Sequence, residues 1–404
     1  MLKPIPGMTE NFGNPSLDDK PVTTLSAVPL IKDRRVILLA TATITKANLF
    51  SNGLFQNVFI LYKMFDAMGY APILIVHEKP KDLADIPQML HSCRMMNTEE
   101  ILKRPIPVTA LIEIGMSIDP LVREFVKMLG GKLAKLYLGN ILNIDIETPM
   151  FYPTMHFAHH VIEKIDRIWV SPHYGQHAEY AAYLNHVVPP ADLKDMIAPY
   201  VWDPCVITRN GELNIRWRPR TCDEEDVIVI MEPNISFQKT SLVGLMIVEH
   251  WYRRTGLTWK GKVVVCNGNR LKDAPHFSNS ILPTLDLHKN DRIEFVERLD
   301  IVSALTKWPA AIYVAHQYNN EYNYMALEHL WTGFPLIHNC GTWGEFGYFY
   351  KGTDIETGAQ QLDVAYRSHH EKAEVYRAHA ATLAWRHSPY NPEVHQAWDR
   401  LLKV

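Results

Sequence analysis

The sequence has little that would place the protein in a membrane or in an oxidising compartment. No apolar run reaches the roughly 18 residues that a membrane helix needs, and residues 1–15 (MLKPIPGMTENFGNP) contain no apolar core of a signal peptide. The five cysteines are scattered without paired spacing, which favours reduced thiols over disulfides. Together these absences predict a cytoplasmic protein without a transmembrane segment.

An excess of one charge sign is also missing. The net charge is −3, and no long basic run is present. Because nucleic-acid-binding domains carry a basic patch or stripe, we do not expect nucleic acid as a partner. The composition, with 47% hydrophobic and 21% charged residues, is that of an ordinary globular protein, so the information lies in the order of the residues. Nothing in that order indicates an oligomeric state.

Buried-strand patterns alternate with helix patterns along the first half of the chain. They follow a region rich in Pro, Asn, Asp and Thr, which we expect to form a surface arm (1–34). The predicted strands cover 35–42, 71–77, 110–114, 133–138 and 167–170, and the predicted helices cover 55–68, 119–129 and 157–165. This alternation is typical of a parallel sheet with helices on both faces.

The same alternation begins again after a proline-rich linker region, 187–224. The second series has predicted strands at 227–231, 262–266, 293–296, 311–315 and 336–337, helices at 241–255 and 301–305, and a helical end with a break at 388–392. A chain of 404 residues is also too long for one ordinary core. We therefore predict an α/β protein with two Rossmann-like, doubly wound domains, 35–210 and 211–375, which face a ligand-binding cleft at the C-terminal ends of their strands.

The most informative stretch of the chain is 319–339, NNEYNYMALEHLWTGFPLIHN. It follows a predicted strand and contains a helix pattern that carries Glu328 and ends at Gly333 and Pro335. The residues around Glu328 are apolar, whereas a Glu is usually exposed to solvent. A carboxylate can accept two hydrogen bonds from a ribose diol, and a helix N-terminus offers backbone N–H groups to phosphate. We therefore predict a nucleotide site at this helix, the alternative being a solvated surface Glu.

Three basic residues follow predicted strands of the second half. They are Lys239, Arg270 and Arg298. A basic side chain at such a place can bind a diphosphate and offset the charge on a departing group. A surface Lys or Arg is the alternative for each of them taken alone.

The first predicted strand–helix turn contains Gly53, in the motif SNGLFQN (51–57). A glycine at such a turn allows a ligand to approach the backbone closely. The second and third glycines of the dinucleotide-binding fingerprint GxGxxG are absent, so the motif does not predict a dinucleotide site.

Candidate acid–base groups of the first half lie after its last two strands. Asp145 and Glu147 fit a general base, a DxE-like metal site or a solvated loop. His173 follows the strand 167–170 and is the preferred histidine for a base. His156 and His160 have the i, i+4 spacing of a zinc-binding pair, but no HExxH motif or cysteine pair accompanies them, so we expect no metal.

The motifs of the second half resemble the C-terminal domain of GT-B fold glycosyltransferases. That group has a Glu-x-x-x-x-Gly-x-Pro pattern, which is similar to 328–335 here. Retaining members have another Glu eight positions earlier, where this chain has Asn320, with Glu321 one residue off. They also use an Arg and a Lys after the first strand of the domain, at positions that hold Asn234 and Lys239 here.

Over almost its whole length the chain is closest to a little-characterised GT-B-like family of bacteria, a domain of unknown function similar to DUF2827. The motifs that carry this resemblance are SNGLFQN (51–57), LGNILNIDIE (138–147), EPNISFQKT (232–240), HQYNNEYNYMALEHLWTGFPLIHN (316–339), GYFY (347–350) and SPYNP (388–392). The resemblance implies a GT-B fold, a UDP-, GDP- or dTDP-sugar as donor, no obligatory metal, and C-terminal helices (376–404) that pack back onto the first domain.

The resemblance also implies roles for individual residues around the donor. Glu328 would bind the ribose, and Lys239, assisted by Arg298, would face the diphosphate. The remaining predicted contacts are Tyr322 and Asn323 to the diphosphate, and His316, Asn320 and Glu321 to the sugar.

The resulting prediction is a glycosyltransferase that moves a hexose or deoxyhexose to a hydroxyl of a glycan acceptor. Asp145 or His173 would contact that acceptor. Two alternatives stay open from the sequence: a nucleotide-sugar epimerase or phosphorylase on the same scaffold, and a non-catalytic glycan-binding protein.

Overall fold

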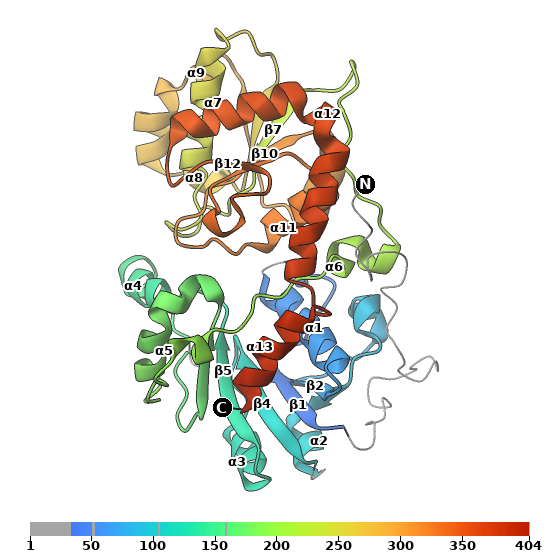
Figure 1. Cartoon of the computed structure of the whole chain (residues 1–404). Helices are drawn as coiled ribbons and strands as arrows, with labels where there is room; N and C mark the ends of the chain where they lie inside the picture. The colour runs from blue at the N-terminus through green and yellow to red at the C-terminus, as the bar shows by residue number, and fades with distance from the viewer. Residues whose placement is uncertain (1–33, 51–52, 104–105, 158–159, 404) are drawn as a thin grey trace.

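The structure, a computed structural model, describes residues 34–50, 53–103, 106–157 and 160–403. These residues form two α/β domains, the first in the lower half of Figure 1 and the second in the upper half. Most of the predicted arm 1–34, together with Ser51 and Asn52 of the first turn, lies outside the described residues.

The first domain contains a six-stranded sheet in the order β3-β2-β1-β4-β5-β6, in which each pair of neighbours is parallel. Its strands are β1 (Val36–Ala40), β2 (Ala71–Val76), β3 (Met95–Asn97), β4 (Val108–Ile114), β5 (Lys132–Tyr137) and β6 (Arg167–Val170). Five of them were predicted, and the short edge strand β3 was not.

The second domain repeats this topology. Its sheet has the order β12-β11-β10-β7-β8-β9, again with parallel neighbours. Its strands are β7 (Val227–Ile230), β8 (Lys262–Cys266), β9 (Ile293–Val296), β10 (Ile312–Val314), β11 (Leu336–His338) and β12 (Tyr348–Phe349). Counted within each domain, both sheets have the doubly wound order 3-2-1-4-5-6, which places the loops after their central strands at a common edge.

Helices cover both faces of each sheet. Those of the first domain are α1 (Gly53–Ala67), α2 (Thr98–Lys103), α3 (Pro120–Met128), α4 (Ile141–Phe151) and α5 (Ala178–Leu184), and α6 (Cys205–Thr208) lies in the connection between the domains. Those that follow are α7 (Leu242–Arg254), α8 (Asn269–Lys272), α9 (Asp286–Lys289), α10 (Ile301–Lys307), α11 (Tyr324–Thr332), α12 (Ile355–Arg386) and α13 (Pro392–Lys403). Within the described ranges, every helix is too short or too polar to span a lipid bilayer.

One predicted helix is wrong. Residues 157–165 form turns and bends in their described part, and the helix of this region is α4, in a segment that we expected to be a loop. Tertiary contacts hold 157–165 in its irregular path, because Tyr137 donates a hydrogen bond to the His160 carbonyl and Ile162 N–H donates one to Asn185. These bonds satisfy backbone groups that a helix would otherwise have used.

The apolar strand runs reflect burial on both faces of the sheets. In β1, Ile37 and Leu39 point to one face, where α1 and α13 pack, while Leu38 points to the other, where α3 and α5 pack. Side chains alternate along a strand, so a strand covered on both sides needs apolar residues at every position. The same division holds in the second sheet, with α10 and α11 on one face and α7 and α12 on the other.

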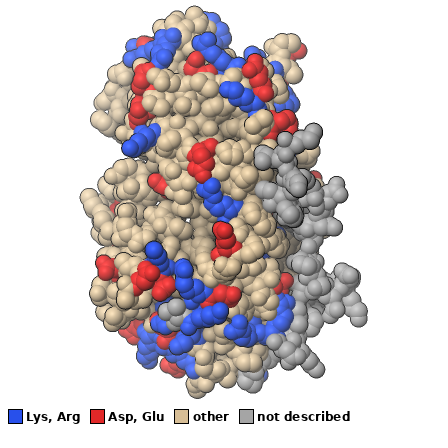
Figure 2. All heavy atoms as spheres, in the orientation of Figure 1, with Lys and Arg blue, Asp and Glu red and all other residues tan. Residues whose placement is uncertain are grey.

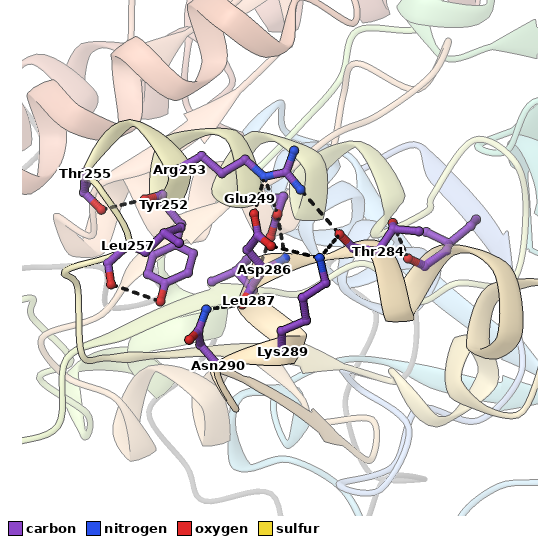
Figure 3. A network of polar contacts seen from close by, with 11 residues as sticks. Glu249, Tyr252, Arg253, Thr255, Leu257, Thr284, Asp286, Leu287, Lys289 and Asn290 are labelled. Atoms are coloured by element: carbon purple, nitrogen blue, oxygen red, sulfur yellow. Dashed lines mark hydrogen bonds and ion pairs between the residues drawn. The ribbon is translucent and has the colours of Figure 1, made fainter.

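A network of polar contacts ties α7 to the segment around α9 (Figure 3). The carboxylate of Glu249 accepts hydrogen bonds from the backbone N–H groups of Asp286 (2.8 Å) and Leu287 (3.0 Å) at the start of α9. Arg253 lies 2.8 Å from Glu249 and 2.9 Å from Asp286. The network lies away from the cleft, so we assign it a structural role.

The chain crosses between the domains a second time near its end. In Figure 1, α12 runs down the side of the second domain and α13 lies on the first. Trp398 of α13 packs edge-on against Phe65 of α1 (5.2 Å between ring centroids) and Trp169 of β6 (5.5 Å). The prediction that the C-terminal helix returns to the first domain is therefore confirmed, and the fold is that of a GT-B protein.

Candidate active site in the cleft between the domains

A cavity of about 480 Å³ lies between the two domains. It is lined by the loops after β1, β4 and β5 of the first domain and by the loops after β7, β8, β9 and β10 of the second. These are the C-terminal ends of the strands, where doubly wound sheets bind ligands. The volume falls within the range of about 300–1,000 Å³ that is common for small-molecule sites.

Glu328 lies on the second-domain wall of this cavity, on α11. Its side chain is buried, and its Oε1 has no hydrogen-bond partner among the described residues. Burial raises the pKa of Glu328 to about 8, although a hydrogen bond from Gln56 of the first domain lowers it in part. A buried acceptor without a hydrogen-bond partner costs free energy unless a ligand donates to it. The arrangement suits a ligand with hydroxyl groups.

The loop after β7 brings Lys239 to the same wall. Burial lowers the pKa of the Lys239 ammonium, the neighbouring carboxyl of Glu232 raises it, and the charge of Arg298 lowers it. Arg298, from the end of β9, also lines the cavity. Two cations in a sheltered cavity favour an anionic ligand, and the charge of a diphosphate would relieve their mutual repulsion.

Glu232 is a cavity residue that we did not single out from the sequence. Its carboxyl accepts hydrogen bonds from His316 N–H (3.2 Å) and from the Gln317 side chain (2.5 Å). Burial raises its pKa to about 8, against the lowering effects of the His316 hydrogen bond and of the Lys239 charge. The sequence signal that could have identified Glu232 is its position directly after a buried strand, where ligand-binding residues of such sheets concentrate.

The N-terminal turn of α11 also faces the cavity. Asn323 is the N-cap and accepts a hydrogen bond from Met325 N–H (3.0 Å), while Tyr322, Asn323 and Tyr324 line the cavity. Asn320 lines it as well, but its amide is engaged with Gln317 (2.6 Å) and with the Tyr174 hydroxyl of the first domain. The turn therefore presents a helix N-terminus to the place where Lys239 and Arg298 lie.

Gly53 begins α1 and lies on the opposite side of the cavity. A Cβ atom at this position would lie 3.3 Å from the ring of Tyr324. The Tyr324 hydroxyl accepts a hydrogen bond from Asn57 (2.8 Å) and donates one to the Val201 carbonyl (2.7 Å). The glycine thus permits close packing of α1 against α11, and the two domains meet at this end of the cleft.

The first-domain wall carries a histidine–aspartate pair. His160 lines the cavity, and its Nε2 lies 2.5 Å from Oδ1 of Asp145 on α4. Asp145 also accepts a hydrogen bond from the Tyr180 hydroxyl (2.6 Å). A carboxylate this close to one ring nitrogen can orient the imidazole. We did not predict His160 as a base, because its only sequence signal was its spacing from His156.

Asp145 and Glu147 do not form a joint metal site. Two residues apart on α4, they point in different directions: Asp145 pairs with His160, whereas Glu147 accepts hydrogen bonds from Ser236 Oγ (3.0 Å) and Phe237 N–H (3.1 Å) of the second domain. Among the described residues, no group of three or more His, Cys, Asp or Glu side chains is placed to hold a metal ion.

His173 lies in an aromatic cluster beside the cavity. Its ring centroid is 3.6 Å from that of Tyr174 and 5.0 Å from that of Tyr322. Burial, and to a smaller extent the charge of Lys239, lower the pKa of His173 to about 3. An imidazole with such a low pKa is a weak base at neutral pH, so the geometry favours His160 over His173 for proton transfer.

Four other predicted site residues are not among those that line the cavity. Glu321 accepts hydrogen bonds from Thr342, and Arg270 is exposed on α8. His316 lies behind Glu232, with Nδ1 2.9 Å from the Tyr350 hydroxyl. The amide of Asn234 is occupied by Ser241 N–H (2.8 Å), Ser241 Oγ (3.0 Å) and the Glu232 carbonyl (3.1 Å), which makes it a residue of the loop structure.

Comparisons with known proteins agree with this architecture. A family model described as "Protein of unknown function (DUF2827)" matches residues 38–402. No curated protein sequence is significantly similar to the chain.

Solved structures with a similar fold cover most of the chain. A mutant O-GlcNAc transferase of Thermobaculum terrenum is 12% identical over 95% of this chain and 71% of its own, with a TM-score of 0.54. Anabaena HepE in complex with UDP-glucose is 10% identical over 90% and 99%, with a TM-score of 0.50. The catalytic domain of starch synthase IV of Arabidopsis thaliana, bound to ADP and acarbose, is 10% identical over 92% and 100%, with a TM-score of 0.51. At these identities the likeness establishes the fold.

Proposed function

The chain belongs to the family described as protein of unknown function DUF2827, and we propose that it is a glycosyltransferase that moves a sugar from a nucleotide diphosphate sugar to a hydroxyl of a glycan. One observation carries the proposal. The buried Glu328, with an orphaned acceptor oxygen, and the cations Lys239 and Arg298 face one cavity at the strand ends of both domains. A ribose diol can donate hydrogen bonds to Glu328, and a diphosphate can bind the two cations.

On the donor side, Glu328 binds the ribose hydroxyls, and Lys239, Arg298 and the start of α11 bind the diphosphate. In the reaction the bond between the anomeric carbon and the diphosphate oxygen breaks, and negative charge develops on the departing nucleoside diphosphate. Cations that are already in place stabilise that charge without reorganising solvent. The carboxyl of Glu232 interacts electrostatically with the Lys239 ammonium.

On the acceptor side, His160 takes the proton of the attacking hydroxyl. The acceptor oxygen forms the new bond to the anomeric carbon as the diphosphate leaves. Asp145 orients the His160 ring and stabilises the imidazolium that results, and Tyr180 fixes Asp145 from behind. His160 lies on the first-domain wall, opposite the proposed donor groups.

The same proposal covers the identity of the donor, the metal requirement and the cellular location. Of the similar structures, HepE was solved with UDP-glucose and starch synthase IV with ADP and acarbose, which supports a nucleotide-sugar donor. We expect a UDP-, GDP- or dTDP-linked hexose or deoxyhexose, transfer without a metal ion, and a cytoplasmic enzyme of glycan biosynthesis.

A thermal-shift screen tests this function. A ligand that binds only the folded state raises the apparent stability by mass action. We expect one of the diphosphates UDP, GDP or dTDP, and one of its sugar conjugates, to raise the Tm of the full chain, and Lys239→Met to abolish the shift. If no nucleotide in the panel raises the Tm, the proposal is wrong.

A further inference from the structure

Exposed large apolar side chains are concentrated beside the mouth of the cleft. Of the eighteen that the described residues contain, six lie within α4 and the segment that follows it. They are Ile146, Met150, Phe151, Met155, Phe157 and Val161. Scattered exposed apolar residues are normal, but a group of this kind marks an interaction site.

Three more lie on the facing edge of the second domain. They are Ile235, Phe237 and Tyr318, and the rings of Phe237 and Tyr318 pack at 5.6 Å between centroids. The two edges touch: the Tyr152 hydroxyl donates to the Ile235 carbonyl (2.5 Å), and Glu147 accepts from Phe237 N–H (3.1 Å). The nine side chains therefore border one surface, which we call the apolar rim.

Charges in α4 turn away from this surface. Asp145 is paired with His160 and Tyr180, and Glu147 is paired with the loop of Phe237, so both carboxylates are held by protein groups. In Figure 1, α4 projects at the left edge of the first domain, and in Figure 2 the same place is largely free of charged atoms, whereas Lys and Arg gather lower on the face. A projecting helix that exposes Met and Phe side chains, and whose two carboxylates are both paired with protein groups, suits insertion between lipid headgroups.

The apolar rim is continuous with the candidate active site. Phe157 is exposed at the rim and also lines the cavity, next to His160. On the other edge, the loop that exposes Phe237 carries Lys239 into the cavity two residues later. A molecule that binds the rim with its apolar part would thus present its polar end to both walls of the cleft.

We propose that the apolar rim docks on a lipid bilayer, and that the acceptor is a lipid-linked glycan whose head enters the cleft. The acceptor class rests on the proposed function, whereas the docking does not. A bilayer fits better than a protein partner, because protein interfaces surround their apolar centre with polar residues that are available for pairing, and the two carboxylates here are already occupied. The α4 edge would enter the bilayer interface with Met150 and Phe151, which are 66% and 62% exposed.

Flotation of the full chain with vesicles of phosphatidylcholine and phosphatidylglycerol tests the docking. We expect the unaltered protein to float with the vesicles, also at high salt, because apolar contacts are not screened. The double variant Met150→Glu/Phe151→Glu should reduce the bound fraction at least about tenfold, since each side chain buries apolar area in the lipid. Phe237→Glu, on the other edge, should reduce it less.

Val375→Glu is the matched control. Val375 is 74% exposed on α12, away from the rim, and its replacement should leave flotation unchanged. The double variant and Val375→Glu should melt at the temperature of the unaltered chain, because the replaced side chains are exposed. Flotation that is absent in the unaltered protein, or equal in the double variant, overturns the docking.

Two further readouts separate the claims. Sedimentation that shows a dimer broken by the double variant would make the rim a contact between two copies and would overturn the bilayer. Nucleotide binding by thermal shift, measured on the same samples, reports on the proposed function alone. Vesicle binding without nucleotide binding supports the docking and refutes the acceptor assignment. Nucleotide binding without vesicle binding supports the proposed function and refutes the docking.

Discussion

The two walls of the cleft are built in different ways from the same topology. The second-domain wall consists of the loops after β7, β8, β9 and β10 and of α11, and it places Lys239, Arg298 and Glu328 at one cavity. The first-domain wall depends on α4 and on the irregular segment 157–165, which tertiary hydrogen bonds hold in place. A site at regular strand ends can be inferred from local pattern, whereas a site on irregular segments exists only through the fold.

The largest expected effect is the loss of transfer rate when His160, on the first-domain wall, is replaced. His160→Gln should lower the rate constant for transfer about 10²- to 10⁴-fold, the usual contribution of a general base, and should leave nucleotide affinity unchanged. The measurement is kcat for transfer, with nucleotide binding followed by calorimetry. His156→Gln is the control, since His156 is exposed nearby and is not among the residues that line the cavity. Transfer that survives in His160→Gln would assign the base elsewhere.

The second prediction concerns Lys239, on the second-domain wall. Lys239→Met should lower kcat about 10²- to 10³-fold, because a cation that stabilises the departing diphosphate is lost. Unlike His160→Gln, it should also weaken the binding of the nucleoside diphosphate. Lys272→Met, at an exposed position on α8, provides the comparison. Equal nucleotide affinity in Lys239→Met and the unaltered chain would remove Lys239 from the donor site.

A smaller change is expected from Glu328→Gln. The variant keeps the shape of the side chain and one acceptor oxygen, so nucleotide affinity should fall about tenfold, as expected when one of the hydrogen bonds to the ribose diol is lost. Titration calorimetry with the diphosphate found in the thermal-shift screen measures this, with Glu374→Gln on the exposed side of α12 as control. An unchanged affinity would mean that Glu328 does not contact the ribose.

The smallest effect concerns stability. Burial raises the pKa of Glu328 from its ordinary value near 4.5 to about 8, so the folded state binds this proton more tightly than the unfolded state. Its contribution to stability is complete below about pH 4.5 and is lost as the pH rises toward 8. Glu232 acts in the same direction. In Glu328→Gln the fall in the free energy of unfolding between pH 5 and pH 8 should be smaller by about 1 kcal/mol or more, as measured by urea unfolding. An identical fall in both proteins would contradict the raised pKa.

The contrast between the walls also explains which parts of the molecule could be predicted from the sequence. Strands such as β1 and β7 are buried on both faces, so their continuous apolar runs are visible in the sequence. The end of α11 is marked in the sequence by Gly333 and Pro335. The edge strand β3 has three residues and no such signal. In α4 the apolar residues do not gather on one side of the helix, and Pro149 lies inside it, so the sequence shows no helical stripe.

The site residues follow the same division. Glu328 and Lys239 could be predicted as site residues because each follows a predicted strand at a position that matches the pattern of GT-B glycosyltransferases. The link between His160 and Asp145 joins two segments whose local patterns we interpreted wrongly, and the partner of Glu147 lies in the other domain. Such contacts arise from packing between distant parts of the chain, which no local pattern contains.

A crystal structure of the full chain with the bound nucleoside diphosphate tests the central claim most directly. We predict that the ribose hydroxyls lie within hydrogen-bond distance of the Glu328 carboxylate, and that the diphosphate contacts Lys239 at the start of α11. A nucleotide bound in the cleft that contacts neither Glu328 nor Lys239, or one bound outside the cleft, would contradict it.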